Sequence, residues 1–342
     1  MNTTKIVLAS LLASVGLQAV ADQPPAMPGT PGPSRVAEPA AFTAVQQRLN
    51  RLAAQAAACP ADYHRFKSQA WLNLARDKWH DNGEAAAVDD SLVQATALLD
   101  RLEQGGSPPW DTPALRAAPQ VRADLWQQAE AMRRSNRLCA STDVQRLAAF
   151  CEVQLAWSGY EATRGGWKHM APYIRIAEDL CAEAQRVPPA PEPPPPIAAL
   201  VPSNPVPPNP VPQQRVLSAQ ALFRHDKSAL ADVLPAGLQA VNALAVQLRT
   251  VVGLRQVVVT GHADSTGAPG YNQRLALARA DTVRNLLVMR AVDASKVEVR
   301  SLGATQPVVT DCQPGRGAAA WKAYTACLQP NRRVEIGWLQ AP

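Results

Sequence analysis

Several short motifs of common enzymes are absent from this chain. It contains no Cys-x-x-Cys pair, His-Glu-x-x-His zinc motif, Gly-x-Ser-x-Gly turn, phosphate-binding loop or dinucleotide fingerprint. His225-Asp226 and His262-x-Asp264 lack a third ligand at a compatible spacing. The sequence therefore predicts no catalytic activity, no cofactor and no metal site. His262 is expected to be an ordinary residue at the end of a strand.

Long hydrophobic runs are also lacking, apart from one near the start. Met1–Ala21 combines Lys5, an apolar stretch over residues 6–17, and Ala19-Val20-Ala21, which is typical of a secretory signal peptide. The stretch is too short to span a membrane, and no other segment is long enough. No cysteine follows the predicted cleavage site, so we expect no lipid anchor. The sequence predicts an exported, periplasmic protein with no transmembrane segment in the mature chain.

Six cysteines agree with an oxidising compartment. Cys312 and Cys327 flank one loop of the C-terminal region and are the easiest pair to assign. Four others, Cys59, Cys139, Cys151 and Cys181, allow three pairings. We favour Cys151–Cys181, because both would face across one helical hairpin, which leaves Cys59–Cys139.

The N-terminal half has helical spacing and almost no strand signal. Residues 22–41 are rich in Pro and Ala and predict a disordered lead-in. The helical domain is expected over residues 42–186, with helices near 42–58, 62–80, 88–104 and 119–135 and a long pair across 142–186.

A weak internal repeat lies within the helical domain. Ala75 precedes Ala95 by 20 residues and Ala156 precedes Ala177 by 21. Two helical hairpins of this size would stack as in tetratricopeptide-like arrays. Six of the eight tryptophans lie here, and they are expected to be mainly core residues. The alternative is an aromatic groove for an envelope protein partner, and the sequence does not select between them.

A proline-rich linker over residues 187–214 follows. Thirteen of the 26 residues in 187–212 are Pro, which favours polyproline II at about 3.1 Å per residue and a reach of about 80 Å. We expect this linker to separate two domains rather than to dock them.

The C-terminal region, residues 215–340, alternates strand and helix patterns. Strands are expected near 216–224, 256–262, 296–301 and 332–338, and helices over 234–252 and 271–290. The fold class is therefore multidomain, with an all-α N-terminal domain and an α/β C-terminal domain of order βαβαβ-β. Its helices should pack on a mixed sheet.

Positive charge is concentrated in the C-terminal region. Residues 213–342 hold 15 Lys and Arg against 8 Asp and Glu, whereas residues 22–186 hold 18 against 19. A basic domain often binds nucleic acid. Export argues against that partner, and no aromatic stacking platform interleaves the arginines. A polyanionic cell-wall surface is the better expectation, and the alternative is that the charge serves only solubility.

A carboxylate and a guanidinium are placed to meet in this region. Asp264 follows a β-branched run, and Arg279 lies on the next helix, in line with Asn272 and Leu275. Such a pair suits a zwitterion, with Asp264 on an ammonium and Arg279 on a carboxylate. The alternative is a surface ion pair worth under about 1 kcal/mol.

The same residues resemble the OmpA-like peptidoglycan-associating domain over about 216–338. The blocks are Leu222–Lys227, Gly261-His262-Ala263-Asp264, the helix from Tyr271-Asn272 through Arg279-Ala280 to Val283, Ser301-Leu302-Gly303 and Asn331–Ile336. All five fall in the family's order, which makes the match specific. Some relatives also carry a disulfide matching Cys312–Cys327.

The resemblance implies the ligand and its site. The ligand would be the diaminopimelate residue of peptidoglycan stem peptides, gripped by Asp264 and Arg279. Asn272, Thr266 and Arg332 would lie at the pocket rim. Ala263 and Ala276 stand where the family usually has Thr and Ser, which puts the affinity in question but not the main pair.

These observations predict a non-catalytic periplasmic protein, associated with the cell wall and the outer membrane side of the envelope, that tethers or scaffolds the envelope. The alternative is that the helical domain is the main functional module, an adaptor for an envelope protein, and the C-terminal domain localises it. A wall-modifying enzyme is the remaining alternative.

Overall fold

The computed structural model describes residues 40–55, 59–80, 85–188 and 213–340. The predicted signal peptide, most of the lead-in and the proline-rich segment 189–212 lie outside the described residues. Among the residues that are described, no helix is both long enough and apolar enough to cross a membrane.

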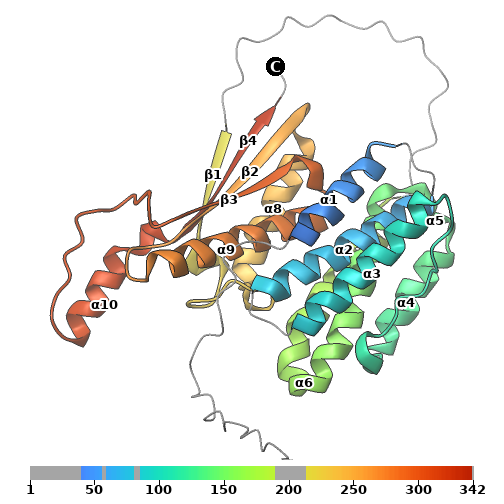
Figure 1. Ribbon diagram of the computed structural model, residues 1–342, viewed down its shortest axis with the longest axis horizontal. Coiled ribbons are helices and arrows are strands. Elements are labelled where there is room, and N and C mark those ends of the chain that lie inside the picture. The colour runs from blue at the N-terminus through green and yellow to red at the C-terminus, as the bar shows by residue number, and fades with distance from the viewer. Residues whose placement is uncertain (1–39, 56–58, 81–84, 189–212, 341–342) are drawn as a thin grey trace, which may run out of the picture. The chain divides into compact units, whose positions relative to one another are not determined.

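Helices make up the N-terminal half, as the periodicity predicts (Figure 1). The long segment breaks into two at Gly165 and Gly166, because Gly166 has φ of 58° and ψ of −147°, which side chains disfavour. A short extra helix precedes it. The bounds are α1 Ala40–Ala53, α2 Ala61–His80, α3 Ala85–Glu103, α4 Ala123–Arg134, α5 Asn136–Ala140 and α6 Thr142–Arg186.

The tryptophans of this half divide between core and surface. Trp71, Trp79 and Trp157 are buried, as expected of core residues. Trp110 and Trp167 are exposed by 39% and 64%. The four repeat alanines are buried, which lets neighbouring helix backbones approach closely. The tetratricopeptide-like interpretation remains a prediction.

A four-stranded mixed sheet organises the C-terminal half. Its order is β1-β4-β2-β3, with β4 antiparallel to both neighbours and β2 parallel to β3. Helix α9 packs on the sheet and α8 packs against α9, which confirms the predicted α/β domain. The bounds are β1 Gln213–Ser218, α8 Pro235–Thr250, β2 Leu254–His262, α9 Pro269–Met289, β3 Val297–Gly303 and β4 Arg333–Gln340.

Two elements of the C-terminal half differ from the sequence prediction. The first strand ends at Ser218, not 224, because the amide of Ala219 donates to Arg332 O and the chain turns into the short helix α7, Ala219–Leu222. The second is α10, Ala318–Cys327, which was not predicted. No residue of α10 is buried, so the segment carries no amphipathic pattern by which to recognise it.

Three disulfides form, between the pairs that the sequence analysis favours. Cys151–Cys181 joins the two halves of α6 and Cys312–Cys327 closes the segment that ends in α10. Cys59–Cys139 is the third pair.

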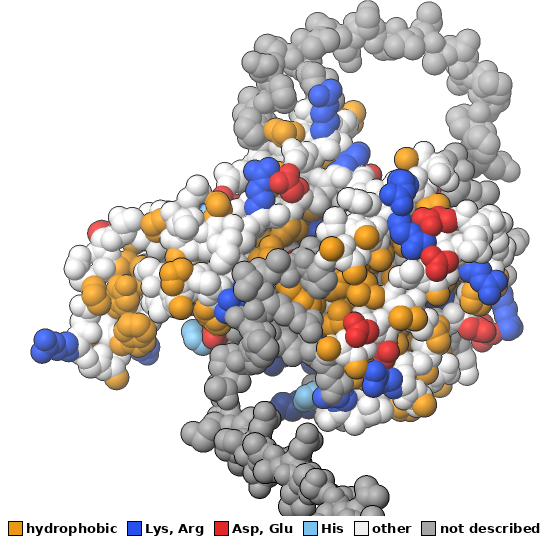
Figure 2. Space-filling model, in the orientation of Figure 1, with side chains coloured by type: hydrophobic (Ala, Val, Ile, Leu, Met, Phe, Trp, Pro, Cys, Tyr) orange, Lys and Arg blue, Asp and Glu red, His pale blue; other side chains and the backbone are white. Residues whose placement is uncertain are grey.

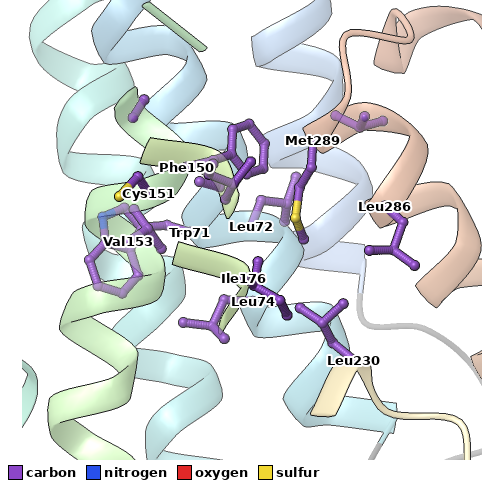
Figure 3. Close-up of a cluster of buried hydrophobic side chains, with 14 of the residues drawn as sticks. Trp71, Leu72, Leu74, Phe150, Cys151, Val153, Ile176, Leu230, Leu286 and Met289 are labelled. Carbon is purple, nitrogen blue, oxygen red and sulfur yellow. The ribbon is translucent and has the colours of Figure 1, made fainter. Parts of the chain in front are cut away.

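The expectation that the linker keeps the domains apart is wrong. Helix α9 lies against α2, and both contribute to one continuous hydrophobic cluster (Figure 3). Leu72 and Leu74 of α2 belong to it, as do Leu286 and Met289 of α9. Burial of apolar surface stabilises such a contact at about 25 cal/mol per Å². A proline-rich connection sets the reach between two segments but does not prevent their docking.

Polar contacts also join the two halves. His80 Nε2 lies 3.0 Å from Asp281 Oδ2, and Asn285 Nδ2 donates to Asn73 O at 3.3 Å. Asp77 Oδ1 accepts the amide of Leu230 at 2.7 Å. Asn73, Asp77, Asp281 and Asn285 are buried, so each would lose a partner without gaining water freely if the halves separated.

Candidate functional site

A cavity of about 520 Å³ opens where β2 ends and α9 begins. Its other walls come from the segment 219–226 and from α10. All five residues that the sequence nominates line it: Asp264, Thr266, Asn272, Arg279 and Arg332. Residues 68 positions apart in sequence thus meet in one cavity.

The close approach of α9 to β2 brings Asp264 and Arg279 to the same cavity. A Cβ at Gly261 would lie 1.9 Å from the carbonyl oxygen of Ala276, so only glycine allows this packing. Beyond it, the amide of Ala263 donates to Gly303 O at 2.8 Å, which holds the strand end beside β3. Asp264 is the next residue, at the cavity wall.

Asp264 is held ionised by its neighbours. Its Oδ1 accepts from the amide of Thr266 at 2.9 Å and from the hydroxyl at 2.5 Å, and its Oδ2 is paired with Arg332. Burial opposes ionisation, but the contacts from Thr266 and Arg332 outweigh it and lower the pKa of Asp264. The carboxylate therefore stays negative at neutral pH.

Replacing Thr266 by valine is expected to raise the pKa of Asp264 toward its ordinary value, because one of the stabilising donors is lost. A carboxyl whose folded pKa is depressed contributes stability above its unfolded pKa and loses it as pH falls through the folded pKa. In Thr266→Val this loss should begin at a higher pH. Carboxyl NMR titration measures the shift, with Thr250→Val on α8 as the control. An unchanged titration of Asp264 would contradict the assignment.

Asn272 braces the loop after Asp264. Its Nδ2 donates to Asp264 O at 2.8 Å and to Gly267 O at 3.0 Å, and the side chain is buried. Both donor hydrogens of the amide are used in this way. We therefore interpret Asn272 mainly as support for the loop that presents Asp264 and Thr266.

Arg279 presents an unused donor. Its Nε donates to Lys227 O at 3.0 Å, while its buried Nη1 has no hydrogen-bond partner among the described residues. The residue is 4% exposed, and burial lowers its pKa, although Asp226 and Tyr271 oppose that shift. A guanidinium remains charged in proteins. A buried cation with a free N–H at a cavity is suited to bind an anionic oxygen.

Arg332 has a larger role than the rim position expected of it. Besides its ion pair with Asp264, its Nη2 donates to Thr325 O on α10 at 3.1 Å. Asp264 is therefore not a free carboxylate. An ammonium arriving at Asp264 would share it with Arg332.

Comparison with known families identifies this part of the chain. Residues 222–320 match the model of the OmpA family. These residues form an OmpA family domain.

Curated relatives match the OmpA-like domain and not the whole chain. Outer membrane protein A of Serratia odorifera is 39% identical over 121 residues, which cover 35% of this chain and 48% of that protein. The same protein of Klebsiella pneumoniae is 36% identical and is covered over 34% of its length, with 35% of this chain aligned. The chain thus spans a third to a half of the length of these relatives.

Solved structures also align with this part of the chain. The cell wall anchor of the T6SS from Pseudomonas aeruginosa is 27% identical with a TM-score of 0.31, covering 38% of this chain and 82% of that one. The peptidoglycan-associated lipoprotein from Burkholderia pseudomallei is 24% identical with a TM-score of 0.27, covering 36% and 89%.

Some contacts at the site of the OmpA-like domain had no signal in the sequence. Tyr271 donates to Asp226 Oδ1 at 2.7 Å, and burial together with that contact raises the pKa of Tyr271 to about 12. Trp321 and Lys322 of α10 form part of the wall. Trp321 and Lys322 lie far from Asp264 along the chain, so local spacing could not place them there.

The histidines of this domain do not assemble a metal site. Among the described residues, no group of three or more His, Cys, Asp or Glu could hold a metal ion. His262 is buried at the end of β2, with Nε2 3.6 Å from Glu335. Burial lowers the pKa of His262, and Arg333 adds to that effect. His225 lines the cavity.

Proposed function

We propose that this protein is a non-catalytic periplasmic binder of peptidoglycan, which holds diaminopimelate of the stem peptides in the cavity of its OmpA-like domain. It would tether or scaffold the envelope near the outer membrane. Residues 222–320 belong to a family of envelope proteins, and the resemblance of their motifs implies this ligand.

The observation that carries the proposal is the unused donor of Arg279. Burying a cation with a free N–H costs free energy unless a partner arrives. A ligand carboxylate would supply that partner, while Nε stays on Lys227 O. No alternative acceptor among the described residues bonds to Nη1.

The ammonium of the same amino-acid end would lie on Asp264. A carboxylate has about four acceptor positions, and Thr266 and Arg332 use three at Asp264. One acceptor position remains for an ammonium. The lowered pKa of Asp264 keeps this carboxylate negative. The site therefore offers opposite charges to the two ends of a zwitterion, which an uncharged ligand would not use.

Binding of meso-diaminopimelate to the mature full-length chain tests the proposal. Arg279→Ala should weaken it by about 2 kcal/mol or more, or about thirtyfold, because the ligand carboxylate loses its buried partner. Arg255→Ala, an exposed arginine at the start of β2, removes the same charge away from the cavity. Calorimetric titration gives the affinities, and thermal unfolding confirms that each variant is folded. Equal affinity of Arg279→Ala and wild type would refute the proposal.

The full chain is the correct material for this test. Deleting residues 1–212 would expose the buried face of α9 and remove Asp77 from the amide of Leu230. That loop also holds Arg279 through Lys227 O. Loss of binding in the fragment would therefore not identify the pocket.

A further inference from the structure

Asp77 of α2 is a buried carboxylate that bonds to the other half of the protein. Figure 2 shows charged side chains of both signs side by side on the surface of the helical half, whereas Asp77 is 2% exposed. Its Oδ1 accepts the amide of Leu230 at 2.7 Å, and its Oδ2 lies 3.6 Å from Lys78 Nζ. Burying a charge costs free energy unless strong partners compensate. The carboxylate of Asp77 and the amide of Leu230 therefore depend on each other.

The side chain of Leu230 is held by the helical half as well. Leu230 begins the short 3₁₀ turn Leu230–Asp232 and is buried. It belongs to the same hydrophobic cluster as Leu74 of α2 and Ile176 of α6 (Figure 3). A residue that is fixed through both its amide and its side chain has little freedom to move. The helical half therefore sets the position of the loop that ends at Leu230.

The loop before Leu230 is bonded to α9 at two points. Lys227 O accepts Arg279 Nε at 3.0 Å, and Ser228 O accepts the hydroxyl of Thr282 at 2.7 Å. The guanidinium is planar, and its Nε carries a single hydrogen. The position of Lys227 O therefore sets the direction in which Nη1 of Arg279 points, and Nη1 is the donor with no hydrogen-bond partner among the described residues.

We infer that Asp77 is a positioning residue for the cavity of the OmpA-like domain. Through the amide of Leu230 and the loop 227–230, it holds Arg279 in the orientation that presents Nη1 to a ligand carboxylate. This inference rests on the proposed function and adds that the helical half is needed for full affinity. Because coupling between two sites is reciprocal, ligand binding should also strengthen the docking of the two halves.

Calorimetric titration of the full mature chain with meso-diaminopimelate tests the inference. Asp77→Ala should weaken binding about five- to tenfold, because the loop loses its charged acceptor and Arg279 is no longer held in one orientation. Asp77→Asn keeps an acceptor for the amide of Leu230 and should keep most of the wild-type affinity. His80→Ala is the matched control, because it removes another polar contact between the halves, at Asp281 rather than at the loop. Its affinity should equal that of wild type.

The Nε–H group of Arg279 gives a second measurement, which a merely structural role of Asp77 would not change. In wild type its hydrogen bond to Lys227 O should slow exchange with water. Asp77→Ala should speed this exchange about tenfold, whereas Asp77→Asn and His80→Ala should keep the wild-type rate. NMR measures the rate, and the absence of the signal in Arg279→Lys assigns it. Thermal unfolding confirms that each variant is folded at the temperature of measurement.

The outcomes separate this inference from the proposed function. Wild-type affinity in Asp77→Ala, or an equal loss in His80→Ala, would overturn the inference. A loss in Asp77→Asn as large as in Asp77→Ala would also overturn it, because the charge beside Lys78 would then matter instead of the loop. If wild type does not bind diaminopimelate, the proposed function fails. The exchange rate of Arg279 Nε–H then still decides whether Asp77 positions Arg279, since an unchanged rate in Asp77→Ala would refute it.

Discussion

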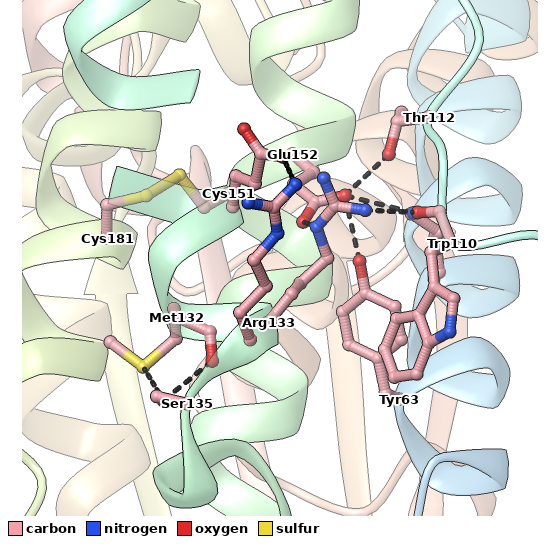
Figure 4. A network of polar contacts seen from close by, with 12 residues as sticks. Tyr63, Trp110, Thr112, Met132, Arg133, Ser135, Cys151, Glu152 and Cys181 are labelled. Carbon is pink, nitrogen blue, oxygen red and sulfur yellow. Dashed lines mark hydrogen bonds and ion pairs between the residues drawn. A yellow bond between two sulfur atoms is a disulfide. The ribbon is translucent and has the colours of Figure 1, made fainter. Parts of the chain in front are cut away.

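Replacing Glu152 by alanine is expected to lower the free energy of unfolding by about 3–5 kcal/mol, because it leaves the buried Lys67 and the partly buried Arg133 without their counter-charge. Glu152 is fully buried on α6 (Figure 4). Lys67 Nζ and Arg133 Nε each lie 3.0 Å from its carboxylate. Its Oε2 also accepts from Tyr63 at 2.8 Å and from Thr112 at 2.6 Å.

The stability lost in Glu152→Ala should be limited by a change in the protonation of Lys67. Burial lowers the pKa of Lys67, and Glu152 opposes that effect. Without the carboxylate, Lys67 can lose its proton more easily, which relieves part of the penalty. Arg133 cannot do so and must find water or another acceptor. The loss should therefore be large but should not reach the full cost of two buried charges.

Urea unfolding followed by circular dichroism measures this effect. Glu130→Ala is the control, since Glu130 pairs with Arg134 at the surface and such pairs are worth at most about 1 kcal/mol. Glu152→Gln keeps the size of the side chain and should lie between alanine and wild type. A loss in Glu152→Ala no larger than that of the control would show that the network does not stabilise the helical domain.

Asp281→Ala is expected to lower the free energy of unfolding by about 3 kcal/mol or more, because Asp281 is buried where α9 meets α2. His80 of α2 lies 3.0 Å from its carboxylate. Burial opposes ionisation, but the hydrogen bond and charge of His80, with Arg76 and Arg284, lower the pKa of Asp281 to about 2. Removing the carboxylate leaves these groups without the charge they share.

The pH dependence gives this prediction its sign. A depressed folded pKa means that the carboxylate stabilises the protein above the ordinary value near 4, and that this contribution is lost as pH falls through about 2. The difference in free energy of unfolding between wild type and Asp281→Ala should therefore shrink as pH falls from about 4 to about 2. Urea unfolding at pH values from 2 to 7 measures it, with the exposed Asp311→Asn as control. A difference independent of pH would exclude the ion pair as its cause.

Much of the OmpA-like domain can be predicted because its signals are local. Strand β2 contains the β-branched run and ends at His262, two residues before Asp264, and Pro269-Gly270 opens α9 as the start signal indicates. Asp264 and Arg279 are only 15 residues apart, so a strand, a turn and a helix suffice to bring them to one cavity. The three disulfides follow in part from the hairpin spacing of the cysteines.

Contacts between segments that lie far apart along the chain could not be predicted from the sequence. Asp281, Thr282, Arg284 and Asn285 look like the solvent-facing side of an amphipathic helix, yet all four are buried. Polar residues on a helix surface carry no mark of whether water or another helix covers them. The docking of α2 on α9, and the error about the linker, follow from this.

The sequence by itself determined the order of β1 to β4, α8 and α9 in the C-terminal half and the two charged residues at its cavity, Asp264 and Arg279, because periodicity and short spacing act within one stretch of chain. Only the tertiary structure decided that Arg332 shares Asp264, that α10 forms a cavity wall, and that the helical half covers α9. Each of these depends on side chains far apart along the chain, whose meeting is set by packing and by the partners that buried polar groups require.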